Sequence, residues 1–572
     1  MLTKQKLSIA HWLCLCVTMS LLFASCASGA APTGQPTVNA PTAAQQPTQQ
    51  KSVVRIGWKG GPDTLNPGMS FLSDAYTIFN LVYDTMYELQ LDNTFRLSLA
   101  ESVKTSTDGK IWTYKIRSGI QWHDGQALTA HDIAFTYNFY HTHPDFPYLP
   151  TYTEHFANVV APDDSTLIIT LDEPIPNMEA QLVFLYILPE HIWSKHAAGK
   201  EPVEYQNLDL VGSGPFKLLA YKRNEFVKLA ANPTYFDAKP KVSEVIFQSF
   251  GNADALVQAL QTGQVDMITE LPKTTVPVLR KAANIKLVTG PPLAPDVSDI
   301  FFNQIDSAHC PKDVGGKCTG HPALRDRVVR EALAHATDKQ NIINVLLLGL
   351  GTPGLTLVPN SMTTWYNNTL QDYPFDIAKA NQLLDDAGYK DTDGDGVREM
   401  PDGAHPLNFR LFWANDTPDA PRMADLLGQT WSQIGVKVES QTFEPDALLA
   451  LCCPVYDFDI VIWGWGTDPD PSLLLKAMTT EAIPNGSNET GYANAKFDAL
   501  YDQQSVELDQ KQRQALVWQM QQIVFDDVVY VVPFYAQTAQ AYRTDRFTGW
   551  IIDQPAIVLE DQSSLVKLEP VQ

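Results

Sequence analysis

The sequence is short of positive charge. Of its 572 residues, 41 are lysine or arginine and 65 are aspartate or glutamate, which gives a formal net charge of −24 at pH 7. A protein that binds nucleic acid needs a basic surface to neutralise the phosphates. A deficit of this size therefore argues against DNA or RNA, and no nucleic-acid partner is expected.

Long apolar runs are missing after the N-terminal segment. Residues 1–26 have the pattern of an export signal, in which the basic start MLTKQK precedes the apolar stretch WLCLCVTMSLLFA. This stretch is too short to span a bilayer comfortably. The segment ends in LFASC, which is similar to the lipobox of bacterial lipoproteins, with Phe23 where Leu is usual. The lipobox predicts lipidation of Cys26, and an ordinary secretory signal with a chance cysteine is the alternative.

Charged residues are absent from residues 27–50. The stretch is rich in Pro, Thr, Gln and Ala and has almost no large apolar residue, so it cannot bury a core. Such a composition predicts an extended, flexible tether. A lipid, a tether and a globular body that begins at Lys51 describe a protein held on the outer face of the cytoplasmic membrane.

Cysteine is scarce in the globular body, which contains Cys310, Cys318, Cys452 and Cys453. A short Gly-containing loop separates Cys310 from Cys318, and this spacing favours a local disulfide in an oxidising compartment. The alternative is a zinc site that adds His309 and His321, although zinc ligands usually have tighter paired spacing. Cys452 and Cys453 are adjacent, and the sequence does not indicate with which cysteines they pair.

The body also lacks common signatures of secreted hydrolases. It contains neither a G-x-S-x-G nucleophile elbow nor an H-E-x-x-H zinc helix. The pairs at 123–124 and 131–132 are His-Asp neighbours whose side chains point in different directions, so turn and capping roles are favoured over an acid–base dyad. No enzymatic activity is expected. A secreted hydrolase stays the rival from another class, because a catalytic triad is assembled in space.

Short strands alternate with amphipathic helices along the body, which predicts an α/β fold. Strands are expected in SVVRIGW, WTYKIR, the return segment IQW and DIVIWGW. A helix is expected over residues 74–89, where apolar residues recur at helical spacing. Thr129 with Asp132 forms a capping-box pattern. Further helices are expected to begin near Thr337 or Asp338 and near Asp376.

Residues 391–402 read DTDGDGVREMPD, which follows the ligand order of a calcium loop. The residues at ligand positions 1, 3, 5, 7, 9 and 12 are Asp391, Asp393, Asp395, Val397, Glu399 and Asp402. Pro401 and a strand-like segment replace an exiting helix, so an EF-hand that opens on binding is excluded. We expect a local structural Ca²⁺ clip and no required cofactor; a solvated acidic hairpin loop is the alternative. A calcium-dependent adhesion protein would carry several such loops.

Seven stretches occur in an order that resembles family 5 of the solute-binding proteins of bacterial ABC importers, the dipeptide- and oligopeptide-binding lipoproteins. They are GPDTLNP, WTYKIRSGIQWHDGQALTAHDIAF, GSGPFKL with NPTYF, ALQTGQVDM, ALRDRVVREALAHATDKQNI, FDIAKANQLLDDAGY and DIVIWGWGTDPDP. The resemblance runs from about Lys51 to the C-terminus and covers nearly the whole mature chain.

The resemblance implies a two-lobed clamp of the class II periplasmic-binding-protein type with an extra subdomain (cluster C). The first lobe would combine residues 51–75, 205–300 and 530–572, the extra subdomain would cover 76–204, and the second lobe 301–529. Ligand would bind between lobes that close on it, and the membrane permease of an ABC importer would read the closed form. The implied protein is a monomeric receptor that delivers its ligand.

The resemblance also implies a peptide ligand. In the family a carboxylate after the Trp-rich strand pairs with the peptide α-ammonium, and the matching residue is Asp468. The loop is one residue shorter than usual, so Asp470 is the fallback. Trp463 and Trp465 share one face of the strand and could wall the binding site, with a core role for Trp463 as the alternative. Two further alternatives stay open: Asp468 caps a helix that begins at Pro469, or the ligand is a sugar, a metal chelate or haem.

Overall fold

The computed structural model describes residues 52–484 and 486–571. The expected signal segment, Cys26 and the expected tether lie outside the described residues. Within the described ranges, no helix combines the length and the apolar character that a membrane crossing needs.

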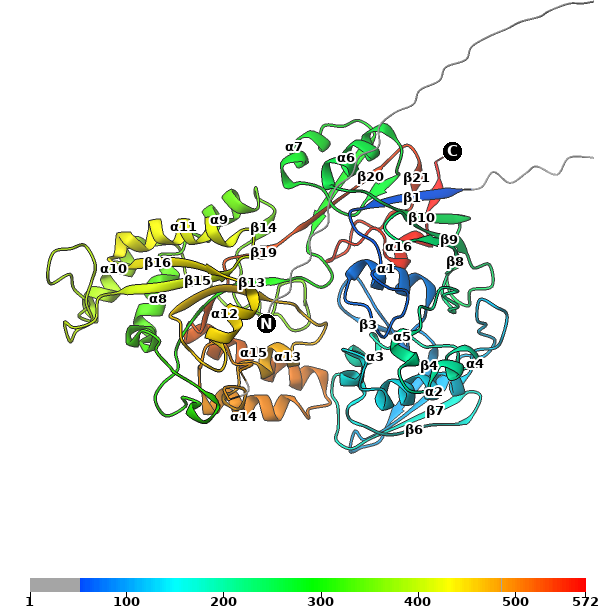
Figure 1. The fold of residues 1–572 in the computed structure, drawn as a ribbon, viewed down its shortest axis with the longest axis horizontal. Coiled ribbons are helices and arrows are strands. Elements are labelled where there is room, and N and C mark those ends of the chain that lie inside the picture. The colour runs from blue at the N-terminus through cyan, green and yellow to red at the C-terminus, as the bar shows by residue number, and fades with distance from the viewer. Residues whose placement is uncertain (1–51, 485, 572) are drawn as a thin grey trace, which may run out of the picture. The chain divides into compact units, whose positions relative to one another are not determined.

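The first large sheet has seven strands and gathers segments from both ends of the body (Figure 1). Its strand order is β12 (Ile285–Gly290), β20 (Thr538–Arg543), β11 (Met267–Ile268), β1 (Val53–Trp58), β10 (Glu244–Ser249), β9 (Phe226–Ala231) and β8 (Phe216–Lys222). Strand β1 is parallel to β10 and β11, whereas β20 is antiparallel to both of its neighbours. The expected strand in SVVRIGW is thus confirmed as β1.

Helix α6 (Ala253–Thr262) covers β1 and β11, and its two ends follow from local sequence. Asn252 Oδ1 accepts a hydrogen bond from the Ala255 N–H at 2.9 Å, which caps the first turn. Gly263 ends the helix with φ of 76°, a left-handed conformation that glycine adopts without steric cost. The chain then enters β11, as the order helix, glycine and short strand predicts.

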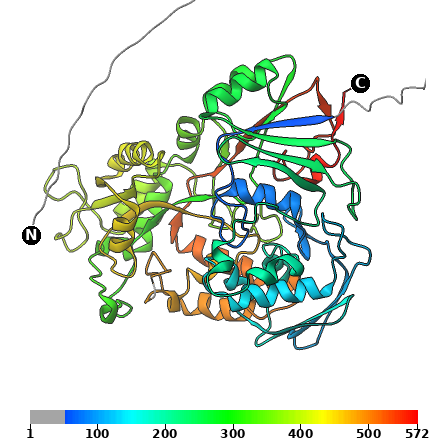
Figure 2. The ribbon, with the colours of Figure 1, turned by 45° about the vertical axis from the view of Figure 1, so that its right-hand side comes forward.

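A smaller sheet has four antiparallel strands in the order β4 (Ala100–Thr105), β5 (Ile111–Ile116), β7 (Thr166–Leu171) and β6 (Phe156–Asp163). Helix α2 (Ala130–Thr142) packs across β6 and β7 (Figures 1 and 2). The capping box at its start is confirmed, because the Thr129 side chain accepts from the helix backbone and Asp132 Oδ2 accepts from the Thr129 N–H at 2.9 Å. The expected strand IQW is limited to one bridge between Gln121 and Ala127.

The expected helix over residues 74–89 is wrong in its second half. Helix α1 (Ser73–Val82) ends where Tyr83 adopts an extended backbone, and strands β2 (Tyr87–Leu89) and β3 (Phe95–Leu97) then form a hairpin. Met86 is buried, as its apolar character requires, but it lies on this extended segment. Apolar spacing alone therefore did not reveal the change from helix to strand.

The second large sheet follows the order β14 (Gly351–Thr352), β19 (Tyr535–Ala536), β13 (Val297–Phe302), β17 (Ile460–Trp465), β15 (Asn408–Ala414) and β16 (Lys437–Phe443), and β18 (Tyr530–Val531) also pairs with β13. Alternate side chains of its central strands enter different cores. Ile300 and Ile462 pack with helices α8 (Arg327–His335), α9 (Lys339–Leu346), α10 (Ile377–Asp386) and α11 (Ala420–Trp431). Phe301 and Val461 pack with helices α12 (Pro445–Cys452), α14 (Ala495–Gln504) and α15 (Gln510–Asp526).

Two short connections join the two large sheets. Residues 291–296 link β12 to β13, and Gln537 alone separates β19 from β20. The boundaries at 301 and 529 drawn from the sequence cut the second sheet, because β13 begins at Val297 and β18 and β19 lie beyond residue 529.

The four cysteines of the body form two local disulfides. One joins Cys310 to Cys318, and the other joins the adjacent Cys452 and Cys453. The histidines of the alternative zinc site have other partners. His309 Nδ1 lies 2.9 Å from Asp306 Oδ1, and His321 Nε2 lies 3.0 Å from the Pro406 carbonyl oxygen.

Candidate ligand-binding pocket

A pocket of about 460 Å³ lies among segments that are far apart in the sequence. Helix α1 and the β2–β3 hairpin supply part of its lining, and residues 148–152 and 183–186 supply more. The connection at 293–294, the loop 467–469 after β17 and residues 561–562 complete it. The lining therefore draws on segments between residues 71 and 562, including the loop after β17 that contains Asp468.

Aromatic side chains form much of the pocket wall. They are Phe71, Tyr76, Tyr83, Tyr87, Tyr148, Tyr152, Phe184 and Tyr186. Tyr152 stacks on Phe184 with ring centroids 4.9 Å apart, and Phe71 meets Tyr148 edge-on at 5.3 Å. Such ring pairs hold one another in fixed orientations. The wall thus offers rigid apolar surface to a bound molecule.

Four carboxylates line the same pocket: Asp84, Glu88, Asp468 and Asp561. Asp84 accepts hydrogen bonds from Ser213 Oγ at 2.6 Å and from the Tyr235 hydroxyl at 2.9 Å. Burial nevertheless raises the pKa of Asp84 to about 6, because the charged form has lost its water. No lysine, arginine or histidine occurs among the described residues that line the pocket.

Asp468 is the carboxylate of the pocket that has no partner in the described part of the chain, since neither a hydrogen bond nor an ion pair reaches it. Partial burial raises its pKa, and the neighbouring charge of Asp470 raises it further. The loop is held in place next to it, where Thr467 Oγ1 donates to the Pro295 carbonyl at 2.8 Å. Asp468 is thus a half-buried acceptor on an anchored loop, with Tyr152 in electrostatic range but no hydrogen-bond donor among the described residues.

The fallback residue Asp470 has a structural role instead. Its two carboxylate oxygens accept from Arg513 at 2.5 and 2.7 Å, and both side chains are buried. Asp470 Oδ1 also accepts from the Ser472 N–H at 2.9 Å, at the start of helix α13 (Ser472–Lys476). Asp470 therefore binds the first N–H of this helix, whose N-cap residue is Pro471, and the alternative in which Asp468 caps a helix at Pro469 is wrong.

The two tryptophans share a face of β17, as their spacing predicts, but neither belongs to the lining of the pocket. Both are partly buried and pack against the core that contains α12, α14 and α15, which for Trp463 is the core alternative. Trp465 Nε1 donates to Glu489 Oε1 at 2.8 Å. Glu489 lies beside the buried Asp299, and loss of water raises the pKa of Glu489 to about 7 and that of Asp299 well above its usual value.

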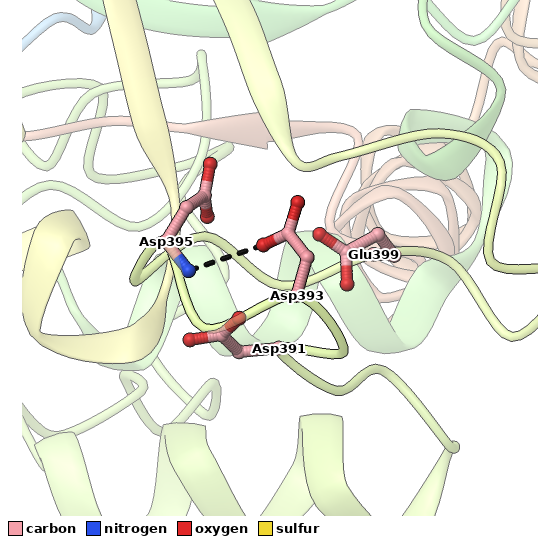
Figure 3. Close-up of side chains that lie close together, drawn as sticks. All are labelled: Asp391, Asp393, Asp395 and Glu399. Atoms are coloured by element: carbon pink, nitrogen blue, oxygen red, sulfur yellow. Dashed lines mark hydrogen bonds between the residues drawn. The ribbon is translucent and has the colours of Figure 1, made fainter.

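The loop 391–402 brings four of the six expected calcium ligands together. One carboxylate oxygen from each of Asp391, Asp393, Asp395 and Glu399 lies within 4.8 Å of the others (Figure 3). Loop N–H groups already use several of these oxygens; the Gly394 N–H, for instance, donates to Asp391 Oδ1 at 2.7 Å. Hard carboxylate oxygens at this spacing fit the ligand chemistry of Ca²⁺.

The other two expected ligands, Asp402 and the Val397 carbonyl, do not belong to this cluster of carboxylates. Asp402 lies outside the cluster, because its oxygens face the Ala404 N–H at 2.9 Å and His405 Nδ1 at 3.1 Å within its own turn. Assigning Asp402 to the twelfth ligand position is therefore wrong. At Val397 the N–H donates to Asp395 Oδ1 at 2.8 Å, and a role for its carbonyl oxygen stays a prediction.

Three of the pocket carboxylates were not found from the sequence. Asp84 and Glu88 lay in a segment that we expected to be helical, and Asp561 comes from a segment more than 450 residues later in the chain. Only the fold brings them to one pocket, so spacing carried no signal for them.

Comparison with known proteins identifies relatives of this chain. The model of the family described as bacterial extracellular solute-binding proteins, family 5, middle region matches residues 94–485. The oligopeptide-binding protein AppA of Bacillus subtilis is 28% identical over 512 residues, which cover 86% of this chain and 88% of AppA. Heme-binding protein A of Haemophilus influenzae is 27% identical over 502 residues, which cover 82% and 84% of the two chains.

A solved structure adds a likeness in three dimensions. The structure of AppA from Bacillus subtilis in complex with a nonapeptide matches with a TM-score of 0.66 at 26% identity. The match covers 91% of this chain and 99% of AppA.

Proposed function

The chain belongs to family 5 of the bacterial extracellular solute-binding proteins, so it is the substrate-binding receptor of an ABC importer, and we propose that its substrate is a peptide. This membership confirms the expected α/β, two-lobed periplasmic-binding fold. It also places the protein outside the cytoplasm, where such receptors act. Peptide as substrate rests on the pocket and on the relatives whose names state peptide binding.

The unpaired carboxylate of Asp468 is the observation that carries the peptide proposal. A peptide has an α-ammonium group at one end, and a carboxylate in a pocket that sheds water forms a strong charge-assisted hydrogen bond with it. Asp468 occupies an anchored loop and has no donor of its own among the residues described. We assign to Asp468 the binding of the peptide α-ammonium group.

Ligand binding and closure are coupled through the same residue. An empty, closed pocket would leave the Asp468 carboxylate without water and without a partner, which costs free energy. A bound ammonium group removes that cost, and the ligand then contacts residues from several parts of the fold at once. Contacts made only in the closed form shift the population towards it. The permease partner would recognise this liganded form.

Three further features belong to the proposal. The protein binds its peptide without cleaving it, acts as a monomer, and is held by a lipid on Cys26 at the outer face of the cytoplasmic membrane. The lipobox-like end of the signal segment supports the anchor. Replacing Cys26 by Ser should move the protein from the membrane fraction to the soluble fraction. Membrane retention of this variant, with an unmodified Cys26 in the parent by mass spectrometry, would exclude the anchor.

The experiment that tests the substrate class is mass spectrometry of the small molecules released when the purified protein is denatured. We expect peptides with free amino termini, and titration calorimetry should show that such peptides bind the stripped protein and are recovered intact. Release of heme, a sugar or a metal chelate, with no peptide binding, would replace the peptide by that ligand. Recovery of shortened peptides would point to the secreted hydrolase.

A further inference from the structure

We propose that the pocket selects cationic peptides, which carry a second positive charge in addition to the α-ammonium group. This inference rests on the proposed function, because it concerns the same pocket and names the class of peptide. It follows from the charges and rings that line the pocket, and from the positive charge that the lining lacks.

Three of the four carboxylates form a group apart from Asp468. Burial is the main cause that raises the pKa of Asp84 and of Asp561, and repulsion from the Glu88 charge raises both further. Glu88 therefore lies within electrostatic range of both aspartates. The Tyr235 hydroxyl that donates to Asp84 accepts from Nε2 of Gln562, the neighbour of Asp561, at 3.0 Å, which links the two aspartates in space. The pocket therefore offers two negative positions: the acidic group made of Asp84, Glu88 and Asp561, and the separate Asp468.

The cation next to the acidic group neutralises it only in part. Arg96 forms ion pairs with Glu88 and with Asp237, and its side chain is 44% exposed and does not line the pocket. One guanidinium is thus shared between two carboxylates, one of which lies outside the pocket. Asp84 and Asp561 are left with neutral donors, Ser213 and Tyr235 for the first and Ser563 for the second.

The aromatic wall suits the same kind of ligand. An ammonium or guanidinium group within about 6 Å of a ring centroid is attracted to the ring face. Tyr152, Phe184 and Tyr186 supply rings to the pocket lining, and some tyrosine hydroxyls there are already used in hydrogen bonds. The Tyr186 hydroxyl, for instance, donates to Asn80 Oδ1 at 2.7 Å. The methylene groups of a lysine or arginine side chain can also lie along these rings.

Negative groups on the ligand have no counterpart in this pocket. A negative group on the ligand would meet four carboxylates and, among the described lining residues, no positively charged side chain. Examples of such a group are a peptide C-terminal carboxylate, an acidic side chain and a heme propionate. Like charges brought together in a desolvated site repel each other and weaken binding. Acidic peptides are therefore disfavoured, and the C-terminal carboxylate of an accepted peptide lies away from these carboxylates.

Titration calorimetry with matched peptides tests the selection. Tetra- and hexapeptides of alanine with a free amino terminus carry lysine, norleucine or glutamate at one interior position, so that lysine and norleucine differ mainly in charge. We expect the lysine peptides to bind about tenfold or more tighter than the norleucine peptides, and glutamate peptides to bind weakest. The advantage of lysine should shrink as salt is raised from low ionic strength.

A pair of variants provides the matched control. Each removes the charge of one of the two carboxylates that pair with Arg96. Glu88→Gln removes a charge that faces the pocket, and Asp237→Asn removes a charge that does not line it. Glu88→Gln should reduce the advantage of lysine over norleucine several-fold, whereas Asp237→Asn should leave most of it. Equal effects of the two variants would overturn the role of the acidic group.

The outcomes separate this inference from the proposed function. Norleucine or glutamate peptides that bind as tightly as lysine peptides would overturn the charge selection and leave a peptide receptor. Binding of no peptide, whatever its charge, would overturn both. The same two positive charges occur in a polyamine, so spermidine is titrated as well. Spermidine binding in the absence of peptide binding would identify the ligand as a polyamine and overturn the peptide assignment.

Discussion

Arg513 and Asp470 form a buried bidentate ion pair that joins helix α15 to the loop after β17. The Arg513 Nη1 and Nη2 atoms lie 2.5 and 2.7 Å from the two Asp470 oxygens, and the side chains are 2% and 5% exposed. Arg513 also donates to Gln504 Oε1 at 3.0 Å and lies 4.7 Å from the Trp365 ring centroid. The loop that presents Asp468 is therefore anchored two residues further on.

Breaking this pair should destabilise the protein. Arg513→Met leaves the Asp470 carboxylate buried and unpaired, which costs about 3–5 kcal/mol of the free energy of unfolding. Urea unfolding of parent and variant measures the loss. Arg422→Met is the matched control, since Arg422 pairs with Asp425 on the surface, where a pair contributes about 0–1 kcal/mol. Similar losses for the two variants would contradict a stabilising role for the Arg513 pair.

Asp468→Asn should weaken the binding of a peptide that has a free amino terminus. The change preserves shape and removes the charge, so we expect a loss of about 2–5 kcal/mol in binding free energy, as for truncation of a buried charge pair. N-acetylation of the peptide should weaken its binding to the parent by a similar amount and have little further effect on the variant. Undiminished affinity of Asp468→Asn in calorimetry would remove Asp468 from the binding site.

The protonation of Asp84 should make stability depend on pH in a predictable direction. Its pKa is about 6 in the folded protein against a usual value of 3.8, so the folded state holds this proton more tightly than the unfolded state does. Its contribution to stability is therefore full below about pH 4 and is lost as pH rises through about 6.

The variant Asp84→Asn isolates this contribution. Between pH 4 and 6 the free energy of unfolding of the parent should fall with pH more steeply than that of the variant, by up to about 1.4 kcal/mol per pH unit. Urea unfolding at several pH values gives the two slopes, and a constant offset between the proteins does not affect the comparison. Parallel slopes would show that Asp84 titrates as it does in the unfolded chain.

We propose that the acidic loop binds Ca²⁺ as a local clip. Calorimetry on chelator-stripped protein should detect one site, and Ca²⁺ at 100 times its Kd should add about 2.7 kcal/mol to the free energy of unfolding. Asp391→Asn with Asp393→Asn should abolish both effects, whereas Asp402→Asn should retain them, because Asp402 lies outside the cluster.

Peptide binding separates a clip from a larger role. It should be unchanged when Ca²⁺ is removed, because none of the clustered carboxylates lines the ligand pocket. Absence of any heat of Ca²⁺ binding would favour the solvated hairpin loop. Loss of peptide binding on chelation, with the fold intact, would assign the loop a part in ligand capture.

Features that depend on a few adjacent residues could be predicted from the sequence. Thr129, Asp338 and Asp376 cap helices, since a side-chain oxygen that reaches a backbone N–H two or three residues on needs no distant partner. Strand β17 also lies where the buried run before WGWG predicts it, and the ordered motifs identified the family. Local hydrogen bonding and burial suffice for such features.

Features that depend on distant segments could not be predicted in this way. Asp470 and Arg513 are 43 residues apart, and only the packing of α15 against the loop brings them together. The end of α1 at Val82 is a second case, because Asp84 beyond it is held by Ser213 and Tyr235, more than 120 residues later. The acidic group of the pocket is assembled by the same long-range contacts, which no spacing in the sequence records.

The place of β20 in the first sheet sets the order in which the protein can fold. Residues 538–543 lie between β12 and β11, so the strand bridges segments that leave the ribosome some 250 residues earlier. Until it arrives, β11 and β12 each present an unpaired edge, which is prone to pair with other chains. An exported chain must therefore emerge almost completely before this sheet closes. A chain that stops short of residue 538 leaves both edges open, and we expect it to aggregate or be degraded rather than to form a smaller receptor.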